Sequence, residues 1–258
     1  MTSIGGETGE TVLITGSNRG LGRALVTRYL LQPNTTVVAA VRNTEDPTSQ
    51  SLSELPRGSG SKLVTAKIES RSDSDAQDVV ELIRSQHGIK KLDIVVANAG
   101  IGEVYGGISQ VKPEDFRDMF DVNAVGPLRL FQAVQPLLEA SNRPRFVLIG
   151  TPIASISAME KMPFPMVAYG ASKAAAHYLT RKMHCESDKL TAFVLDPGFM
   201  QTDLGNRGAR NFGLEKAIVP VDTSADFVFA QIKKATREET SGTYPSIDLE
   251  ASRPFIEW

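Results

Sequence analysis

Short apolar segments and amphipathic segments alternate along this chain from end to end. Runs rich in β-branched and aliphatic residues predict strands at residues 11–15, 35–41, 62–68, 92–97, 145–150 and 190–195, and a last short strand at 243–249. Helical patterns lie between them, at residues 23–31, 72–87, 113–138, 165–187 and 223–236. The alternation predicts an α/β fold in which a doubly wound parallel sheet carries helices on both faces.

Glycine and proline mark the boundaries in this pattern. Gly126 and Pro127 interrupt the third helical pattern, and the segment 202–220 is rich in glycine and has no clear period. No internal repeat or linker divides the sequence. We therefore expect a flexible tail at residues 1–10, followed by a single domain from residue 11 to 258.

Composition narrows the class of protein further. Of the 258 residues, 41% are hydrophobic and 22% are charged, which excludes a chain that is disordered throughout. The formal net charge of −2 gives no reason to expect nucleic acid as a partner. A single cysteine excludes an intramolecular disulfide and favours a reducing, cytoplasmic location. No apolar run is long enough to predict a membrane span, and no cluster of residues predicts a metal site.

A glycine-rich turn follows the first strand and opens the first helix. It reads Gly16, Ser17, Asn18, Arg19, Gly20, Leu21 and Gly22. Glycines at such a turn allow a pyrophosphate to approach the backbone, where the unpaired N–H groups of a helix start face outward. The same three glycines also fit an ordinary strand-to-helix turn. Their position after the first strand favours a dinucleotide site.

Two arginines point to the kind of dinucleotide. Arg19 lies inside the glycine turn, and Arg42 follows the second strand, where an acidic residue would bind a ribose 2′-hydroxyl. Two guanidinium groups at one place suit a 2′-phosphate by charge and by geometry. The alternative is a pair of solvated surface arginines. The hypothesis is a preference for NADPH over NADH.

Tyr169 and Lys173 are spaced i, i+4, so on a helix they share one face. A nearby ammonium group stabilises a phenolate, and we expect the pKa of Tyr169 to fall towards neutral. Such a tyrosine could deliver a proton to a carbonyl oxygen as hydride reaches the carbon. Taken by itself, the spacing also fits a packed tyrosine and a lysine that reaches to solvent.

Further motifs join these in a fixed order from residue 11 to about residue 203, namely Thr15 to Gly22, Asn98 to Gly100, Val122 with Asn123, Tyr169 with Lys173, and Asp196 to Gly198. With these motifs the chain resembles the short-chain dehydrogenases/reductases. More narrowly, it resembles fungal ketoreductases of the norsolorinic acid ketoreductase type. The resemblance implies a Rossmann-type fold, NADP(H) as cofactor, and oxidoreductase activity on C=O or CH–OH groups.

The resemblance also implies roles for individual residues. Tyr169 would be the general acid in reduction and the base in oxidation, and Lys173 would lower its pKa and bind the nicotinamide ribose. Asn123 would hold a water in a proton relay to Lys173, unless it is a core-facing side chain that caps a bend. Besides the glycine turn and Arg42, the expected cofactor contacts are Glu69 beside the adenine, Asn98, Ala99 and Gly100 at the end of the fourth strand, Pro197 and Gly198 beside the nicotinamide, and Thr202 at its carboxamide.

One position departs from the family pattern, in which a serine follows the fifth strand. Alignment on the strand end places Thr151 at the serine position, and its hydroxyl could orient a substrate carbonyl. Ser155, four residues on, is the competitor and would need a loop that folds back. We favour Thr151.

The substrate side is glycine-rich and apolar. We expect residues 201–220 to form a lid. We also expect an apolar cover for the substrate, although simple loop packing would look the same, from Met200, Leu204, Phe212 and Leu214, joined by Met159, Met162, Phe164 and Met166. The predicted function is NADPH-dependent reduction of a hydrophobic ketone or aldehyde, which could be aromatic or polyketide-derived. The alternatives are NADP-dependent alcohol oxidation or epimerisation, and a redox-silent NADP-sensing protein. The resemblance implies a homodimer or homotetramer.

Overall fold

Six parallel strands form one sheet in the computed structural model, which describes residues 9–247, 256 and 258. The strands are β1 Thr11–Thr15, β2 Thr36–Val41, β3 Lys62–Lys67, β4 Ile94–Ala97, β5 Arg145–Ile149 and β6 Thr191–Leu195. Their order is β3-β2-β1-β4-β5-β6, and Val12 of β1 pairs with Val37 on one side and with Ile94 on the other. The order reverses between β1 and β4. In a doubly wound sheet the crevice at that reversal, outside the carboxyl ends of the strands, is where ligands bind.

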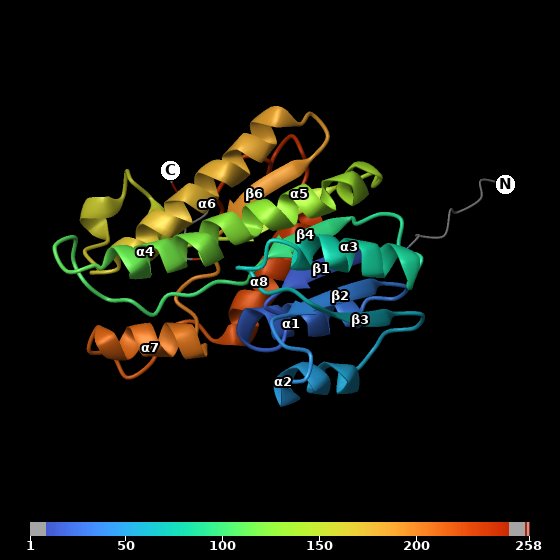
Figure 1. Ribbon diagram of the computed structural model, residues 1–258, viewed down its shortest axis with the longest axis horizontal. Coiled ribbons are helices and arrows are strands. Elements are labelled where there is room, and N and C mark those ends of the chain that lie inside the picture. Colours follow the sequence, from blue (N-terminus) through green and yellow to red (C-terminus); the bar gives the residue numbers. More distant parts are fainter. Residues whose placement is uncertain (1–8, 248–255, 257) are drawn as a thin grey trace.

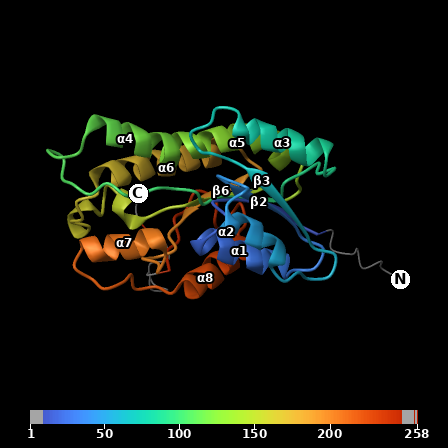
Figure 2. The same ribbon diagram turned by 60° about the horizontal axis from the view of Figure 1, so that its bottom comes forward.

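Helices cover both faces of this sheet (Figure 1). Their bounds are α1 Gly20–Leu30, α2 Pro47–Gln50, α3 Asp75–Ser85, α4 Pro113–Phe120, α5 Gly126–Glu139, α6 Val167–Glu186, α7 Asp203–Asn211 and α8 Val221–Lys234. Figure 2 shows α3, α4, α5 and α6 in one layer, and α1, α7 and α8 in the other. Among the described residues, no helix has the length and apolar character needed to cross a bilayer.

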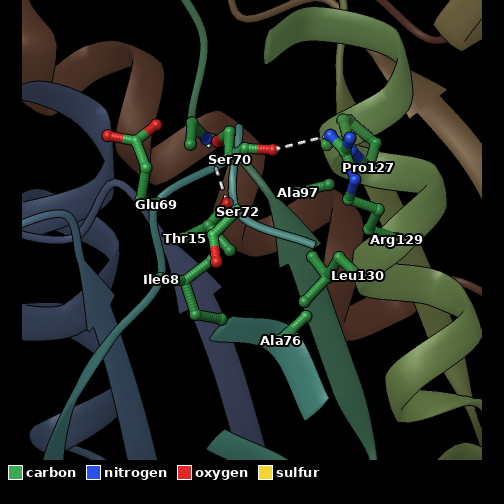
Figure 3. A pocket seen from close by; sticks show the side chains of 12 residues that line it. Thr15, Ile68, Glu69, Ser70, Ser72, Ala76, Ala97, Pro127, Arg129 and Leu130 are labelled. Atoms are coloured by element: carbon green, nitrogen blue, oxygen red, sulfur yellow. Dashed lines mark hydrogen bonds between the residues drawn. The ribbon is translucent and has the colours of Figure 1, made fainter. Parts of the chain in front are cut away.

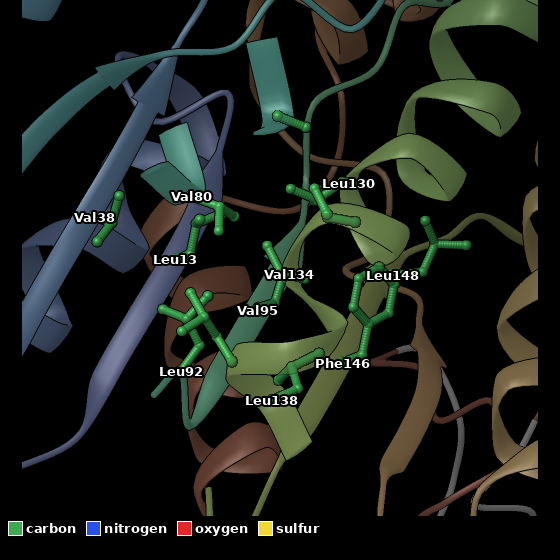
Figure 4. Close-up of a cluster of buried hydrophobic side chains, with 14 of the residues drawn as sticks. Leu13, Val38, Val80, Leu92, Val95, Leu130, Val134, Leu138, Phe146 and Leu148 are labelled. Atoms are coloured by element: carbon green, nitrogen blue, oxygen red, sulfur yellow. The ribbon is translucent and has the colours of Figure 1, made fainter. Parts of the chain in front are cut away.

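The core consists of two clusters, one on each side of the sheet. Successive strand side chains point to opposite faces, so Leu13 packs in the cluster beneath α3, α5 and α6, while Val12 and Ile14 pack in the cluster beneath α1 and α8. Figure 4 shows the first cluster, where Val134 of α5 lies over Val95 of β4. Strands covered on both faces explain the nearly continuous apolar runs in the sequence.

The predicted strands of the sheet are confirmed, with two differences elsewhere in the chain. The run at 243–249 forms an isolated bridge between Ser246 and Asp196 instead of a regular strand, and residues 248–249 lie outside the described residues. The segment 202–220, predicted to have no clear period, contains the helix α7. Thr202 caps this helix by accepting a hydrogen bond from the Gly205 N–H at 3.1 Å. The cap and the packing stabilise a helix that its glycines disfavour.

The predicted flexible tail does not reach Glu10. The Glu10 carboxylate forms ion pairs with Arg145 and with Lys233, the second at 2.7 Å. The Glu10 carbonyl also accepts a hydrogen bond from the Thr36 N–H at 2.9 Å. The backbone hydrogen bond continues the pairing of β1 with β2. Burial raises the pKa of the Glu10 carboxyl group, but the hydrogen bonds and charges of Lys233 and Arg145 outweigh burial, so the pKa is lowered.

Candidate active site

The glycine turn lies at the carboxyl end of β1, at the reversal point of the sheet. Gly16 and Gly20 have φ values of +65° and +52°, which L side chains rarely adopt. A Cβ at Gly22 would lie 2.1 Å from the Gly16 carbonyl oxygen, so no larger residue fits where α1 begins. The turn therefore presents bare backbone at a helix start, which fits the phosphates of a dinucleotide.

Two of the predicted cofactor contacts support the turn from inside. The Asn98 side chain donates to the Thr15 carbonyl at 2.8 Å and to the Gly16 carbonyl at 3.3 Å, which ties the end of β4 to the end of β1. Ser17 is fully buried, and its hydroxyl donates to the Ile14 carbonyl at 2.6 Å. The side chains of Asn98 and Ser17 thus hold the shape of the turn, and Leu21 is buried beside them.

The structure brings the two predicted phosphate-binding arginines together. Arg19 and Arg42 are both exposed, and both act on the carboxylate of Asp46, which caps the short helix α2. The pKa of Asp46 is lowered first by hydrogen bonds from Thr48 and further by the two guanidinium groups. The Asn18 side chain reaches the same place and donates to the Thr48 hydroxyl at 2.7 Å. The exposed cluster thus contains two guanidinium groups and the carboxylate of Asp46.

Glu69, predicted beside the adenine, is engaged by a neighbour. Its carboxylate pairs with Arg71 at 3.3 Å, and Arg71 in turn pairs with Asp118 of α4 at 2.7 Å. Figure 3 shows a small pocket at the ends of β3 and β4 in which the Glu69 side chain points away from Leu130 of α5. Glu69 therefore joins β3 to α4 through Arg71. An adenine in contact with the Glu69 carboxylate would have to share that carboxylate with Arg71.

Tyr169 and Lys173 lie on α6 as predicted, and Thr151 joins them from the end of β5. The Thr151 side chain lies near enough to the Tyr169 phenol to lower its pKa. Lys173 is 4% exposed, and its Nζ donates to the Ile149 carbonyl at 3.0 Å. The end of β5 and the glycine turn lie at the same edge of the sheet, with β4 between β5 and β1.

The predicted fall in the pKa of Tyr169 is wrong for this arrangement. Burial, and then the Asp196 carboxylate, raises the pKa of Tyr169 above its ordinary value, and the hydrogen bond from Thr151 opposes this only in part. Burial lowers the pKa of Lys173 to about 8. The ammonium group is directed at the Ile149 carbonyl, so desolvation outweighs the i, i+4 charge effect that the spacing suggested.

Asn123 lies in a π-helical turn, Asp121–Val125, between α4 and α5. Its Oδ1 accepts from the Ile101 N–H at 2.9 Å, and its Nδ2 donates to the Ile101 carbonyl at 2.9 Å and to the Ser172 hydroxyl at 3.0 Å. The side-chain amide is thus used in the core, as the alternative interpretation expected. A Cβ at Gly100 would lie 3.1 Å from Asn123 Oδ1 and 3.4 Å from Lys173 Nζ, so the predicted relay partners do converge.

Ser155 faces its own loop. It is 1% exposed, accepts a hydrogen bond from the Ala158 N–H at 3.2 Å, and lies 3.1 Å from the Ser157 hydroxyl. Thr151 also caps a short turn, with the Ile153 N–H at 3.4 Å from its hydroxyl, while reaching Tyr169. We keep Thr151 as the preferred candidate, because its side chain acts on the pKa of Tyr169.

The remaining predicted contacts lie after β6. The Gly198 N–H donates to Asp196 at 3.0 Å, and the Pro197 carbonyl accepts from the Ser224 hydroxyl at 2.7 Å. The Thr202 methyl lies 3.1 Å from the Cβ position of Gly20, against the glycine turn. Its hydroxyl is occupied in capping α7, so a contact with a carboxamide would compete with the cap.

Sequence reasoning missed Gly102 and Tyr105, although it had placed Leu204, Phe164 and Phe212 around the substrate. A Cβ at Gly102 would lie 3.2 Å from the Tyr169 ring and 3.5 Å from Leu204, so a larger residue there would crowd both side chains. Phe212 packs against Phe164 at 4.7 Å and against Tyr105 at 6.0 Å between ring centroids. The loop that holds Gly102 and Tyr105 could have been found from its position, because it directly follows the Asn98–Gly100 motif.

A buried aromatic group lies behind the catalytic side chains. His177 and Tyr244 contact each other at 4.8 Å between ring centroids, and Tyr244 lies 5.6 Å from Trp258. Burial, and then the charge on Lys173, lowers the pKa of His177 to about 3, so the imidazole is neutral at physiological pH. Within the part of the chain that the structure describes, no group of acidic, histidine or cysteine side chains is arranged to hold a metal ion.

Comparisons with known proteins agree with this geometry. The family model described as short chain dehydrogenase matches residues 10–211. Norsolorinic acid ketoreductase nor1 of Dothistroma septosporum is 42% identical over 237 residues, which cover 91% of this chain and 88% of the relative. The Aspergillus parasiticus norsolorinic acid ketoreductase is 42% identical over 238 residues, with the same coverage.

A solved structure supports the fold independently. The NADPH-bound carbonyl reductase from chicken fatty liver superposes with a TM-score of 0.83 at 23% identity, covering 98% of this chain and 97% of that one. At that identity the likeness concerns the fold. With the family model and the fungal relatives, it leads to one conclusion: the chain belongs to the short-chain dehydrogenase/reductase family and is an oxidoreductase that acts on carbonyl and alcohol groups.

Proposed function

We propose that this enzyme reduces a bulky, hydrophobic ketone or aldehyde with NADPH. The observation that carries the proposal is that the Thr151 side chain acts on the Tyr169 phenol at the edge of the sheet where the glycine turn also lies. A proton donor and a second hydroxyl at this place suit a carbonyl oxygen that becomes an alcohol. The similarity to norsolorinic acid ketoreductases supports an aromatic, polyketide-derived substrate.

The residues present fit NADP(H). The backbone of Gly16 to Gly22 would hold the pyrophosphate, because a Cβ at Gly22 would collide with the turn and the φ values of Gly16 and Gly20 keep it open. Arg19 and Arg42 would hold the 2′-phosphate, and Ala99 and Gly100 lie at the end of β4 beside the turn. When bound, the reduced nicotinamide supplies a hydride to the carbonyl carbon.

Each catalytic side chain has a definite task in the proposal. The Thr151 hydroxyl orients the substrate oxygen, and Tyr169 Oη delivers its proton to that oxygen. The raised pKa of Tyr169 keeps the phenol protonated at neutral pH, so a proton is present when hydride reaches the carbonyl carbon. Lys173, whose Nζ lies 3.4 Å from the Cβ position of Gly100, returns a proton to the site, and Asn123 holds the adjoining loop at Ile101.

The mouth supports an aromatic substrate. The Phe212 ring, at the end of α7, contacts two other aromatic rings. It meets Tyr105 edge-on and Phe164 at a tilt, and so joins α7 to two loops near Tyr169. Such rings offer flat apolar faces to a planar ligand. We further propose that residues 201–220 act as a lid, since the bridge between Met200 and Val219 pins the two ends of this segment together.

The test is NADPH consumption with a carbonyl panel that runs from small aliphatic ketones to polycyclic aromatic ketones. We expect the highest kcat/KM with the aromatic members, and a loss of at least about a hundredfold in Tyr169→Phe with an unchanged Kd for NADPH. Tyr178→Phe is the matched control, because Tyr178 lies on the same helix and is 66% exposed. Tight NADPH binding without any turnover would instead support a sensor. Turnover only with alcohols and NADP⁺ would support the oxidative alternative.

The assembly and the location of the enzyme stay predictions. A homodimer or homotetramer is expected from the family resemblance, and light scattering during gel filtration measures it. A cytoplasmic location is expected from the single cysteine, and fractionation of the source cells measures that.

A further inference from the structure

The start of α7 touches the glycine turn at two points. Arg19 Nη1 lies 3.0 Å from Asp203 Oδ2, and their side chains are 68% and 69% exposed. At the neighbouring residues, the Thr202 methyl lies 3.1 Å from the Cβ position of Gly20. The contact therefore joins the first residue of α7 to the turn that would hold the cofactor, and it remains open to solvent.

Two negatively charged groups thus compete for the Arg19 guanidinium, namely the Asp203 carboxylate and the proposed 2′-phosphate. In the free protein the guanidinium is held by the carboxylate of Asp203, while under the proposed function it binds the 2′-phosphate of NADPH. A phosphate monoester carries a charge of about −1.5 to −2 at neutral pH and binds an arginine through two parallel hydrogen bonds. It can displace a singly charged, exposed carboxylate, but the cost of breaking the ion pair is subtracted from the binding free energy.

We propose that Asp203 sets the selectivity of this enzyme between NADPH and NADH, by competing with the 2′-phosphate for Arg19. The proposal rests on the proposed use of NADP(H). NADH has no 2′-phosphate, so it leaves the ion pair intact and is indifferent to Asp203. NADPH must take Arg19 from Asp203, so Asp203 weakens the binding of NADPH and moderates the preference for it.

The substitution Asp203→Asn isolates this effect. Asparagine keeps the size of the side chain and removes its charge, and Thr202 still caps α7. We expect the Kd for NADPH, measured by calorimetry on the free protein, to fall about two- to fivefold, the range that exposed ion pairs represent. The Kd for NADH is expected to stay the same. Equal unfolding temperatures of the variant and the wild type would show that the fold is intact.

Asp222→Asn provides a matched control. Asp222 is also an exposed aspartate in the first turn of a helix, α8, and it pairs with Arg28 at 3.3 Å. Its removal changes the net charge of the protein by the same amount, away from the glycine turn. We expect no change in either Kd, so a general charge effect is separated from competition for Arg19.

A double-mutant cycle with Arg19→Ala completes the test, because Asp203→Asn should have no selective effect once Arg19 is absent. Equal tightening of NADPH and NADH, or no tightening at all, would overturn the proposal. Titration with 2′,5′-ADP and with 5′-AMP separates this failure from failure of the proposed function. If the wild type does not prefer 2′,5′-ADP, the assigned cofactor is wrong. If it does and Asp203→Asn leaves that preference unchanged, the role of Asp203 alone is wrong.

Discussion

Replacement of Lys173 by methionine is expected to make the free protein more stable at neutral pH while it abolishes activity. Lys173 is 4% exposed, and burial lowers its pKa from 10.5 to about 8. The folded state therefore holds this proton less tightly than the unfolded state does. Between pH 8 and 10.5 the unfolded state binds more protons, so the free energy of unfolding of the wild type rises with pH and levels off above that window.

The magnitude follows from the same two values. The difference between 10.5 and about 8 corresponds to roughly 3 kcal/mol, at about 1.36 kcal/mol for each pH unit. Methionine has a similar volume but no charge, so it removes this penalty. It also leaves the Ile149 carbonyl without the hydrogen bond at 3.0 Å from Lys173 Nζ, which costs about 1 kcal/mol. We expect Lys173→Met to gain about 1 to 2 kcal/mol at pH 7 and to lose that advantage by pH 10.

The assay is urea unfolding of the cofactor-free protein at a series of pH values, for the wild type and for the variant. The difference between the two curves isolates Lys173 from other groups that titrate in the same range. Lys182→Met is the matched control, since Lys182 lies on the same helix with a side chain 47% exposed, and its replacement should give a nearly pH-independent difference. A variant that is less stable than the wild type at pH 7, or a difference that does not change with pH, would refute the argument that Lys173 is held as a poorly solvated cation.

Further predictions concern the hydroxyls, the cofactor and the turn. Thr151→Ala should lower kcat/KM about a hundredfold, as the loss of one oriented donor does, whereas Ser155→Ala should stay within about threefold; steady-state kinetics that rank them in reverse would contradict the placement of Thr151 beside Tyr169. Arg42→Asp should reduce the ratio of kcat/KM for NADPH over NADH by at least about tenfold, and an unchanged ratio would count against a 2′-phosphate site. Asn98→Ala should lower the free energy of unfolding by about 1 to 3 kcal/mol, measured in urea, because two carbonyls at the turn lose their donor.

The fold follows closely from the sequence where burial is uniform. Strands such as Ile94–Ala97 are covered on both faces, so every position is apolar and the run stands out. The helix α7 was not predicted because it is polar overall and because Gly205 and Gly208, two of its buried residues, are poor helix formers. Packing beside Tyr105 and Phe199 makes the helix stable, and neither neighbour is visible from the local sequence.

The site shows a different limit. Spacing placed Tyr169 and Lys173 on one helix and alignment placed Thr151 at the end of β5, and the structure has the three residues at those positions. The direction of each side chain could not be predicted. The side chains of Ser17 and Asn98 hold the shape of the glycine turn. They donate hydrogen bonds to the carbonyls of Ile14 and Thr15 at the end of β1, because buried carbonyls need donors. A sequence motif therefore marks a position that the site needs, but it does not tell whether the side chain faces the ligand or supports the backbone that faces the ligand.

Burial, more than the charge between neighbours, sets the protonation of this site. It raises the pKa of Tyr169 and lowers that of Lys173, so near neutral pH the phenol keeps its proton and the ammonium gives one up readily. The raised pKa keeps the proton on Tyr169 in the free protein, and the lowered pKa makes the Lys173 ammonium the more acidic of the two groups. The same desolvation destabilises the fold, since a charged lysine is held away from water. A single physical cause thus links the protonation of these two side chains to the stability gain expected for Lys173→Met, and the two should change together in any variant that opens the site to solvent.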